Sequence, residues 1–477
     1  MTTFLICLIV LVASYFLYGT LLDRVAGIDP TADVPSKTMY DGVDYLPLPR
    51  WRIFLIQLLN IAGTGPIFGA ILGACYGPVA FLWITLGGIF MGAMHDYLSG
   101  VISLRNEGRS LPEIIGKYLG KGMHRFSLVM IPILMILVGG VFIVTPAKVL
   151  TSMTAMPYLV WVGIIIAYYF VATILPVDKI IGKIYPIFGA ALIFMALSMF
   201  GMLIFGDYTI PELLSIENMH YNAEKLPIIP TLFISIACGA ISGFHATQSP
   251  LMARCMTNEQ QSRPIFFGAM IAESVIALIW AAVAMAFFGG VEGLNGFMVE
   301  NNNDAGLAVS TISVTTLGAI GSILTLLGVV AAPITSGDTA FRSARLIVAD
   351  MLGIEQRSIV KRLLISLPLF ALGIGIAFID FDVIWRYFAW FNQALSVLTL
   401  WMITAWLSRK GSKCTFLALI PAMIMTYVCS AFVFVSNQFI GMGASMAAYV
   451  YAAAVTAIIS GLIIVKIRKD IKYGATV

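Results

Sequence analysis

Two short runs place glycine, hydroxyl and amide residues inside otherwise apolar sequence. The first runs from Asn60 to Gly69 (NIAGTGPIFG), and the second runs from Cys238 to Pro250 (CGAISGFHATQSP). Gly loosens a helix, and Pro removes a backbone donor, so both runs predict a helix interrupted midway across a membrane. The start of a half-helix offers free N–H groups with positive dipole character. Such a start can bind a carboxylate.

The predicted donors of the first run are the backbone N–H groups of Thr64, Gly65, Ile67 and Phe68, while Pro66 offers none. Their equivalents in the second run are Ser242, Gly243, Thr247 and Ser249. Asn60 and Gln248 are suited to bonding a keto or amide oxygen. The alternative interpretation is that these small residues only let helices pack closely. The predicted substrate-binding residues are Asn60, Gly63, Thr64, Gly65, Phe68, Ser242, Gly243, His245, Thr247 and Gln248.

Ionisable residues inside apolar segments are a second signal, because burying charge in a membrane is costly and is usually functional. His245 is suited to proton relay or substrate contact, since the imidazole pKa lies near neutral pH; the alternative is a neutral ring bonded to a carbonyl. His95 and Asp96 are predicted to act in ion coupling, or else to snorkel as a pair to the inner surface. Glu273 either pairs with a cation or takes part in coupling.

The composition predicts a membrane protein with many spans. Hydrophobic residues make up 60% of the 477 positions and charged residues only 11%, which excludes an ordinary soluble domain. The net charge of +4 does not indicate nucleic-acid binding, because the cations lie in loops between apolar segments. The six cysteines lack metal-type spacing and are interpreted as small apolar side chains. We expect no metal and no cofactor, apart from Na⁺ as a possible coupling ion.

The apolar segments predict an all-α protein of about thirteen transmembrane helices. The ninth contains Pro333 and is too long for one straight span, so we expect it to kink or to project from the bilayer. The first lacks a basic lead-in and a cleavage site, so it is interpreted as a retained helix and not a signal peptide. The predicted ranges are 2–22, 51–73, 78–104, 126–145, 157–175, 185–205, 229–253, 265–289, 317–350, 363–379, 385–407, 415–436 and 442–465.

Charge placement predicts the orientation. With these helices, all but Lys148, Lys225 and Arg386 of the 28 Lys and Arg residues fall on one side, which is therefore expected to be cytoplasmic. The loops 206–228 and 290–316 on the other side are acidic. The N-terminus is predicted to be outside and the C-terminus inside, in a multi-pass protein of a bacterial inner membrane.

This topology predicts two five-helix repeats of opposite orientation, each opening with a broken helix, in the manner of the LeuT-like fold. The repeats span 51–205 and 229–407. Residues 1–50 form an N-terminal helix and a cytoplasmic linker, and 415–477 form two accessory helices and a basic tail. Gly441, Gly443, Ala444 and Ala447 there would suit a homodimer contact. A short amphipathic helix is expected within 108–118, with Ser110 as cap and Glu113 completing a capping box.

Several of these motifs resemble the carbon starvation protein A (CstA) family over most of residues 1–410. They are 60–73, Tyr40 to Tyr45 (YDGVDY), His95 to Gly100 (HDYLSG), Ser110 to Glu113 (SLPE), Ser242 to Ala246 (SGFHA) and Pro333 to Gly337 (PITSG). The resemblance implies a secondary importer of pyruvate or short peptides with a LeuT-like fold, in the amino acid–polyamine–organocation superfamily. Two departures, Gln248-Ser249-Pro250 and Asp338, touch the expected site.

Within that fold, Thr335 and Ser336 would resemble the sodium site of relatives, whereas Asp338 could instead take and release a proton. The alternatives are that the hydroxyls bond their own helix carbonyls and that Asp338 pairs with Arg342.

The predicted function is cation-coupled import of a small carboxylate or peptide across the lipid bilayer, with no enzymatic activity. The alternatives are a starvation-responsive sensor or channel and a metal-dependent membrane enzyme.

Overall fold

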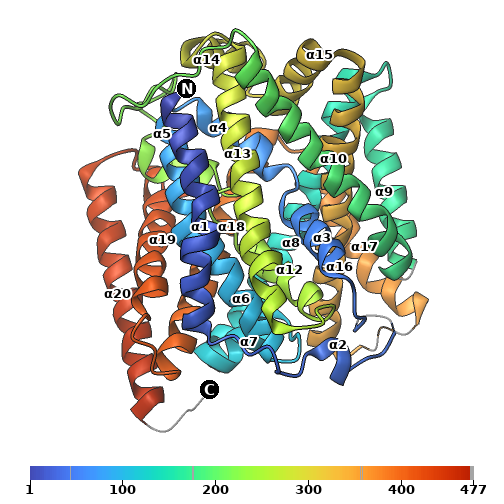
Figure 1. Ribbon diagram of the computed structural model, residues 1–477, viewed down its shortest axis with the longest axis vertical. Coiled ribbons are helices and arrows are strands. Elements are labelled where there is room, and N and C mark those ends of the chain that lie inside the picture. Colours follow the sequence, from blue (N-terminus) through green and yellow to red (C-terminus); the bar gives the residue numbers. More distant parts are fainter. Residues whose placement is uncertain (43–44, 175–176, 355, 357, 473–477) are drawn as a thin grey trace.

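The computed structural model describes residues 1–42, 45–174, 177–354, 356 and 358–472. Val43 and Asp44 of the YDGVDY motif, and Arg357 of the charge tally, lie outside the described residues. Within them the chain is helical, with helices that run mostly along one direction (Figure 1). Apolar side chains project outward from several helices, as at Phe16 and Leu17, which are 64% and 74% exposed. Such an outer surface suits lipid and not water.

The helices of the first half, with π-helical segments marked η, are α1 (Thr2–Ala26), α2 (Pro35–Thr38), α3 (Arg50–Ile61), η1 (Gly65–Gly69), α4 (Ala70–Ala74), α5 (Val79–Leu82), η2 (Trp83–Ala93), α6 (Met94–Arg105), α7 (Leu111–Leu119), α8 (Lys121–Met153), α9 (Tyr158–Ile174) and α10 (Val177–Phe205).

The second half comprises η3 (Ile228–Leu232), α11 (Phe233–Ser235), α12 (Gly243–Ala253), the 3-10 turn η4 (Glu259–Gln261), η5 (Arg263–Phe267), α13 (Gly268–Phe287), α14 (Val291–Glu300), α15 (Ala305–Leu324), η6 (Thr325–Val330), α16 (Ala331–Leu352), α17 (Ile359–Ile376), α18 (Phe381–Arg409), α19 (Phe416–Val435) and α20 (Met446–Lys472).

In the part of the chain that the structure describes, ten helices are long and apolar enough to cross a membrane, or eleven when a bent pair is counted as one span. The protein is thus a multi-pass membrane protein, while the number thirteen stays a prediction. One expectation was wrong, because loop 290–316 holds α14 and the start of α15. The expected kink of the segment 317–350 is present, but it lies at Gly318 (φ +56°), inside α15, and not at Pro333. A positive φ suits Gly, which has no Cβ to clash.

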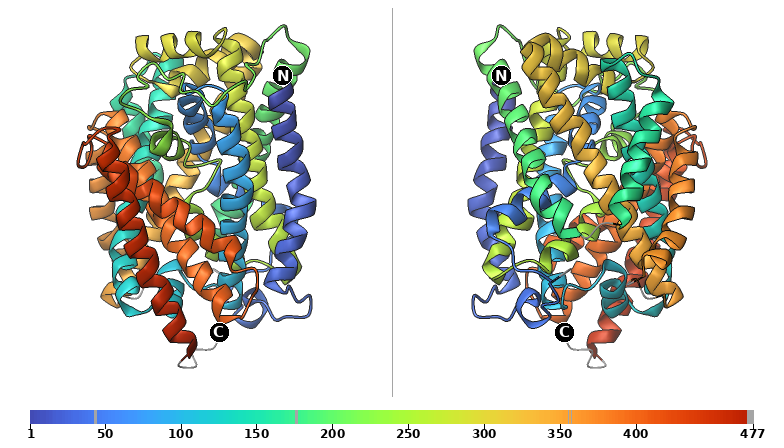
Figure 2. Two further views of the ribbon diagram at one scale, coloured as in Figure 1. Left: turned by 90° about the vertical axis from the view of Figure 1, so that its left-hand side faces the viewer. Right: turned by 90° about the vertical axis from the view of Figure 1, so that its right-hand side faces the viewer.

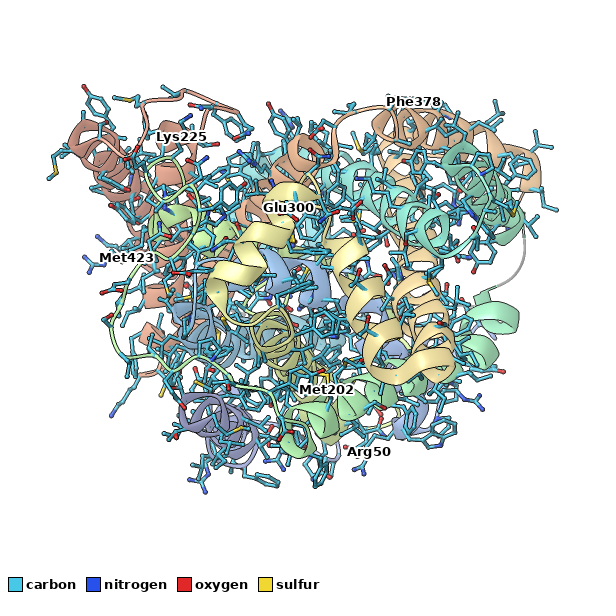
Figure 3. The ribbon with its side chains drawn as sticks, turned by 90° about the horizontal axis from the view of Figure 1, so that it is seen from above. Arg50, Met202, Lys225, Glu300, Phe378 and Met423 are labelled. Carbon is cyan, nitrogen blue, oxygen red and sulfur yellow. The ribbon has the colours of Figure 1, made fainter. Side chains whose placement is uncertain are left out.

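The two ends of the bundle differ. The chain starts at the end that carries α14, and α2, α7 and the last described residues lie at the other end (Figure 1). Seen from the first end, α14 with its Glu300 lies over the middle of the bundle (Figure 3). The final helices α19 and α20 lie together against one side (Figure 2).

Both predicted helix breaks are confirmed. The first separates α3 from η1 and α4, which continue at an angle of 55°. The second leaves residues 236–242 without helical structure between α11 and α12. Gly239 lies there with φ +93°, in a region that residues with a Cβ rarely adopt. Gly and Pro thus mark the first break, whereas Gly239 marks the second and Pro250 lies inside α12 without interrupting it.

The amphipathic helix expected within 108–118 is confirmed as α7, but its capping box is not formed. Ser110 is the N-cap residue and makes no side-chain cap bond. Pro112 at the second helical position has no N–H, which removes one of the two donors that an N-cap oxygen normally accepts from.

The C-terminal end of α7 is capped by a side chain that is distant in sequence. The Arg409 guanidinium at the end of α18 donates to the carbonyls of Lys117 and Tyr118, at 3.1 and 2.9 Å. The same group bonds the Asp470 carboxylate of α20 at 3.1 Å. One side chain thus connects three helices at this end of the bundle.

Candidate functional site

The two helix breaks touch each other in the interior. A Cβ added at Gly65 would lie 2.2 Å from the Cβ of Cys238, and one added at Gly239 would lie 3.8 Å from the Cα of Pro66. All four residues are buried. Two irregular backbone segments from distant parts of the chain therefore form one shared centre, the arrangement that marks a transporter site.

The first break retains unused donors. The N–H groups of Gly63, Thr64 and Gly65 donate no hydrogen bond within the described chain. The side-chain amide of Asn60 and the hydroxyl of Thr64 are buried and also have no hydrogen-bond partner. Buried polar groups are normally satisfied, so this group of atoms is suited to a polar ligand.

Two predicted donors of the first break are wrong. The N–H groups of Ile67 and Phe68 both donate to the Thr64 carbonyl, at 3.2 and 2.8 Å, because the helix resumes after Thr64. Gly63 lies under the Phe142 ring, and a Cβ added at Gly63 would be 2.7 Å from that ring. The Phe68 ring lies beside Trp385. These two contacts are packing contacts, as the alternative interpretation held.

The second break is closed by an amide from α18. The Asn392 Oδ1 accepts from the backbone N–H of Phe244 at 2.8 Å and from the Ser242 hydroxyl at 3.1 Å. This amide therefore occupies the N-terminal end of α12. A Cβ at Gly243 would lie 2.5 Å from the Asn392 carbonyl, so this glycine allows α12 and α18 to pack closely.

Other polar side chains of α12 bond within their own helix. The hydroxyls of Thr247 and Ser249 donate to the carbonyls of Phe244 and His245, at 2.6 and 3.1 Å. The Gln248 Nε2 donates to the Thr247 hydroxyl at 2.9 Å, whereas its Oε1 is buried and unpartnered. Of these three side chains, Gln248 is the one with an acceptor still available.

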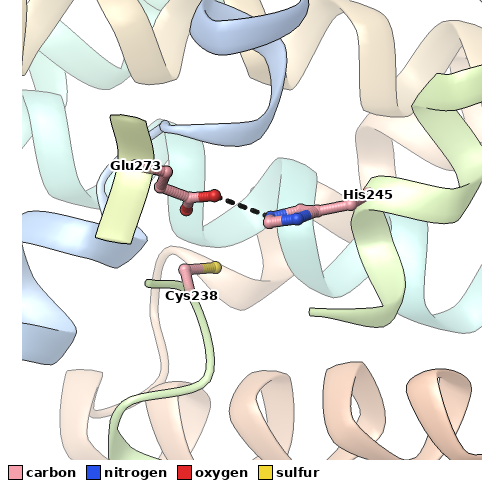
Figure 4. Close-up of side chains that lie close together, drawn as sticks. All are labelled: Cys238, His245 and Glu273. Carbon is pink, nitrogen blue, oxygen red and sulfur yellow. Dashed lines mark ion pairs between the residues drawn. The ribbon is translucent and has the colours of Figure 1, made fainter. Parts of the chain in front are cut away.

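Four ionisable side chains form one buried cluster beside the breaks, which we call the His–Asp cluster. Asp96 lies at its centre, with its two oxygens 2.7 Å from the Nδ1 atoms of His95 and His245. The His245 Nε2 then faces the Glu273 carboxylate at 3.4 Å (Figure 4). None of the four side chains is exposed. The structure brings together all the predicted ionisable residues except Asp338.

Two alternatives from the sequence are excluded by this geometry. His95 and Asp96 do not snorkel to the surface, because both are fully buried against His245. The His245 ring bonds a carboxylate, not a backbone carbonyl. The side chain of Cys238 also enters the cluster, close to His245 and Glu273 (Figure 4).

A second polar group lies on α16. The Ser336 hydroxyl is 3.0 Å from the carbonyls of Leu59 and Ala332, so it contacts the last turn of α3 before the first break. The Thr335 hydroxyl donates to the Ala332 carbonyl at 2.7 Å. Both hydroxyls bond their own helix, as the alternative interpretation held, and one of them also reaches the break.

Asp338 lies one turn further along α16. Its carboxylate is 3.5 Å from the Arg342 guanidinium, and it accepts from the Tyr185 hydroxyl at 3.3 Å. The pairing with Arg342 is therefore confirmed. Tyr185 also donates to the Thr335 carbonyl at 3.2 Å, which connects the carboxylate to the hydroxyl pair.

A small pocket lies beside α4, α11 and α18, lined in part by Tyr76, His220, Trp385 and Arg386; we call it the side pocket. Its volume of about 50 Å³ holds a few water molecules, since one water needs roughly 10–15 Å³ on this scale. The His220 ring, on the loop before η3, lies 4.7 Å from the Tyr76 ring. Burial, together with nearby Arg386, lowers the pKa of His220 to about 4, so this imidazole is neutral at pH 7.

Sequence reasoning missed three residues of this centre: Cys238, Asn392 and Tyr185. Asn392 and its neighbour Gln393 form an amide pair midway along an apolar span, and this signal could have been used. Cys238 directly precedes the glycine of the second break. Tyr185 carries no comparable signal, because tyrosine is common in membrane helices.

A family model for the carbon starvation protein CstA matches residues 1–159 and 143–318. The chain belongs to this family. It is 25% identical over 461 residues to a Campylobacter jejuni protein named peptide transporter CstA, covering 81% of this chain and 62% of that one. It is 26% identical over 359 residues to the Escherichia coli pyruvate/proton symporter BtsT, covering 62% and 49%. The chain thus spans about half to two thirds of these relatives.

Among solved structures, the fold is similar to that of Mhp1, a transporter of the nucleobase-cation-symport-1 family. The TM-score is 0.53 at 12% sequence identity, with 88% of this chain and 92% of that chain covered. At this identity the likeness establishes the fold alone, and it confirms the predicted LeuT-like class. These relatives and neighbours are transporters and not enzymes, as the sequence predicted.

Proposed function

We propose that this family member imports a small carboxylate nutrient, pyruvate or a short peptide, by alternating access driven by a cation gradient. The observation that carries the proposal is the first break, where three backbone N–H groups, the Asn60 amide and the Thr64 hydroxyl lie buried without partners. A carboxylate needs such donors once it leaves water. The names of the two relatives support the substrate class.

The coupling ion is proposed to be H⁺ or Na⁺, each with its own residues. For Na⁺, the hydroxyls of Thr335 and Ser336, with the Leu59 carbonyl beside the first break, supply the oxygen ligands. For H⁺, the buried Asp338 carboxylate between Tyr185 and Arg342 is the proton acceptor. The name of the E. coli symporter supports the proton.

The division into inverted repeats at 51–205 and 229–407 is part of the same proposal. Each range opens with a broken helix, and the start and the last described residues lie at opposite ends of the bundle (Figure 1). We place the end that carries α2 and α7 in the cytoplasm, on the strength of its Lys and Arg excess. A dimer through α19 and α20 is a further expectation.

Reconstituted protein tests the proposal. Proteoliposomes loaded under an imposed Na⁺ gradient at constant pH, or an imposed pH gradient without Na⁺, are assayed for uptake of labelled pyruvate and of di- and tripeptides. One substrate class should accumulate under one gradient only. Uptake no greater than in empty liposomes, for every substrate under both gradients, would contradict the proposed function.

A matched pair of variants tests the site itself. Thr64→Val keeps the side-chain shape and removes an unpartnered hydroxyl. Hydrogen bonds to charged groups contribute about 1.5–3 kcal/mol, so KM should rise about ten-fold to a hundred-fold. The control is Thr404→Val, since Thr404 is equally buried and bonds its own helix carbonyl at 2.8 Å. Equal KM values for both variants would place the substrate elsewhere.

A further inference from the structure

Three potential metal ligands converge beside the second break. The Cys238 Sγ, a His245 ring nitrogen and a Glu273 carboxylate oxygen all lie within 4.8 Å of one another (Figure 4). They come from the break itself, from α12 and from α13. Cys238 is 4% exposed, and His245 and Glu273 are not exposed at all.

The hydrogen bonds of His245 determine which nitrogen is available. Its Nδ1 lies 2.7 Å from an Asp96 oxygen, and a carboxylate only accepts, so Nδ1 carries the hydrogen. In a neutral ring the Nε2 then presents a lone pair. That Nε2 and both Glu273 oxygens are buried and have no partner with full hydrogen-bond geometry, although the Cys238 thiol lies near the ring and the Gly239 N–H near the carboxylate.

The Nε2 and the Glu273 carboxylate therefore face each other with lone pairs, across 3.4 Å. Two such atoms repel unless a positive centre lies between them. A proton on Nε2 would draw the oxygen to about 2.7–2.9 Å, the usual length of a charge-assisted bond, and Asp96 shows that length on the other side of the same ring. The observed separation is longer.

The separation instead matches two corners of a tetrahedral metal site. With metal–ligand bonds of about 2.0–2.3 Å, neighbouring ligand atoms lie about 3.3–3.8 Å apart. Thiolate, imidazole and carboxylate are the ligands of zinc-type ions, and three protein ligands leave the fourth position open.

The surroundings of the three ligands fit the same interpretation. Metal-binding histidines usually donate their other N–H to a carboxylate, which fixes the ring. Asp96 fills this role for His245, and His95 in turn holds Asp96. Asp96, Glu273 and the Cys238 thiolate together bring three negative charges into an apolar interior when all are ionised, and a dication offsets two of them.

We propose that Cys238, His245 and Glu273 bind one zinc-type transition-metal dication, with the Cys238 thiol releasing its proton on binding and the fourth position open. The ion would lie directly against the first break, because Gly65 packs on the Cys238 side chain. This inference goes beyond the proposed function, and binding of the ion is measured without any transport.

The test uses full-length protein in detergent, purified without a metal-affinity step and treated with a chelator. Co²⁺ is the spectroscopic probe, and Zn²⁺ is the competitor. We expect one Co²⁺ per chain, a thiolate-to-cobalt charge-transfer band, d–d bands of tetrahedral strength, and loss of both on adding Zn²⁺. Zn²⁺ should also raise the Tm of the wild-type chain.

Variants locate the ligands. Cys238→Ser should remove the charge-transfer band, and Glu273→Gln should weaken Co²⁺ binding at least ten-fold. Cys429→Ser is the matched control, because Cys429 is a buried thiol on α19 outside the three-ligand group, and it should keep the band.

The wild-type measurement does not depend on whether any variant folds. No thiolate band, together with a Tm that Zn²⁺ leaves unchanged, would overturn the proposal and leave a proton between His245 and Glu273. A band that survives in Cys238→Ser would overturn it as well.

Discussion

The contact between Gly65 and Cys238 allows the shared centre of the two breaks to be tested by stability measurements on packing variants, without any transport assay. A Cβ at Gly65 would lie 2.2 Å from the Cβ and 2.3 Å from the Sγ of Cys238, whereas the next atom, the Cys238 Cα, would be 3.6 Å away. Ordinary contact begins near 3.4 Å, so Gly65→Ala forces the two breaks apart by about 1.2 Å. Overpacking of this kind costs about 1–3 kcal/mol.

The double variant Gly65→Ala/Cys238→Gly removes both obstructing atoms and leaves the 3.6 Å contact. We therefore expect Gly65→Ala to lower the free energy of unfolding in the wild-type background and to have little effect in the Cys238→Gly background. Unfolding in mixed micelles with increasing denaturing detergent measures all four proteins. The coupling energy of this cycle should reach about 1–3 kcal/mol. If the two substitutions change the free energy of unfolding additively, the two breaks are not in contact and do not form a shared centre.

Three further predictions concern other contacts. Asn392→Ala leaves buried donors at the start of α12 unpaired, so stability should fall by about 1–3 kcal/mol, and an unchanged unfolding transition would exclude the capping role. Ser336→Ala removes an oxygen from the last turn of α3; for a sodium-driven cycle, the Na⁺ concentration for half-maximal uptake should rise about ten-fold, and an unaltered Na⁺ dependence would leave Asp338 as the coupling group. Hydrogen bonds from the Met1 ammonium and from Thr3 lower the pKa of Glu212 to about 2. A carboxyl group whose pKa is lower in the folded protein than in the unfolded chain stabilises the folded state at pH values above the unfolded pKa. That stabilisation is lost as the pH falls toward 2. Amide exchange at Thr3, corrected for its intrinsic rate, should therefore stay slow at pH 5 and speed up toward pH 2. The same increase in Glu212→Gln would refute this.

The helix breaks could be predicted because their cause is local. Gly and Pro at 63–66, and the glycine at 239, disrupt a helix whatever surrounds them. The apolar spans were predictable for a similar reason, since their length and composition follow the bilayer. The turn at Gly318 was missed because Pro333 is a stronger signal in sequence, although the helix around Pro333 continues without interruption.

The hydrogen-bond partner of each buried polar group could not be predicted, because it depends on contacts between segments that are distant in sequence. Asn392 reaches the N–H of Phe244 across 148 residues of sequence, and no pattern around either residue indicates that pairing. The depth of His95 and Asp96 was also ambiguous, since they lie only ten and nine residues before Arg105, the last residue of their helix. Only the packing of α6 against α12 shows that they face inward.

The contacts of Arg409 have a consequence for any movement at the end of the bundle that carries α2 and α7. Because one guanidinium binds the last carbonyls of α7 and also the Asp470 carboxylate of α20, tilting α18 there must drag both neighbours with it or break three bonds at once. Helix α20, which lies against one side of the bundle, is therefore coupled through Asp470 to any displacement of α18 at this end.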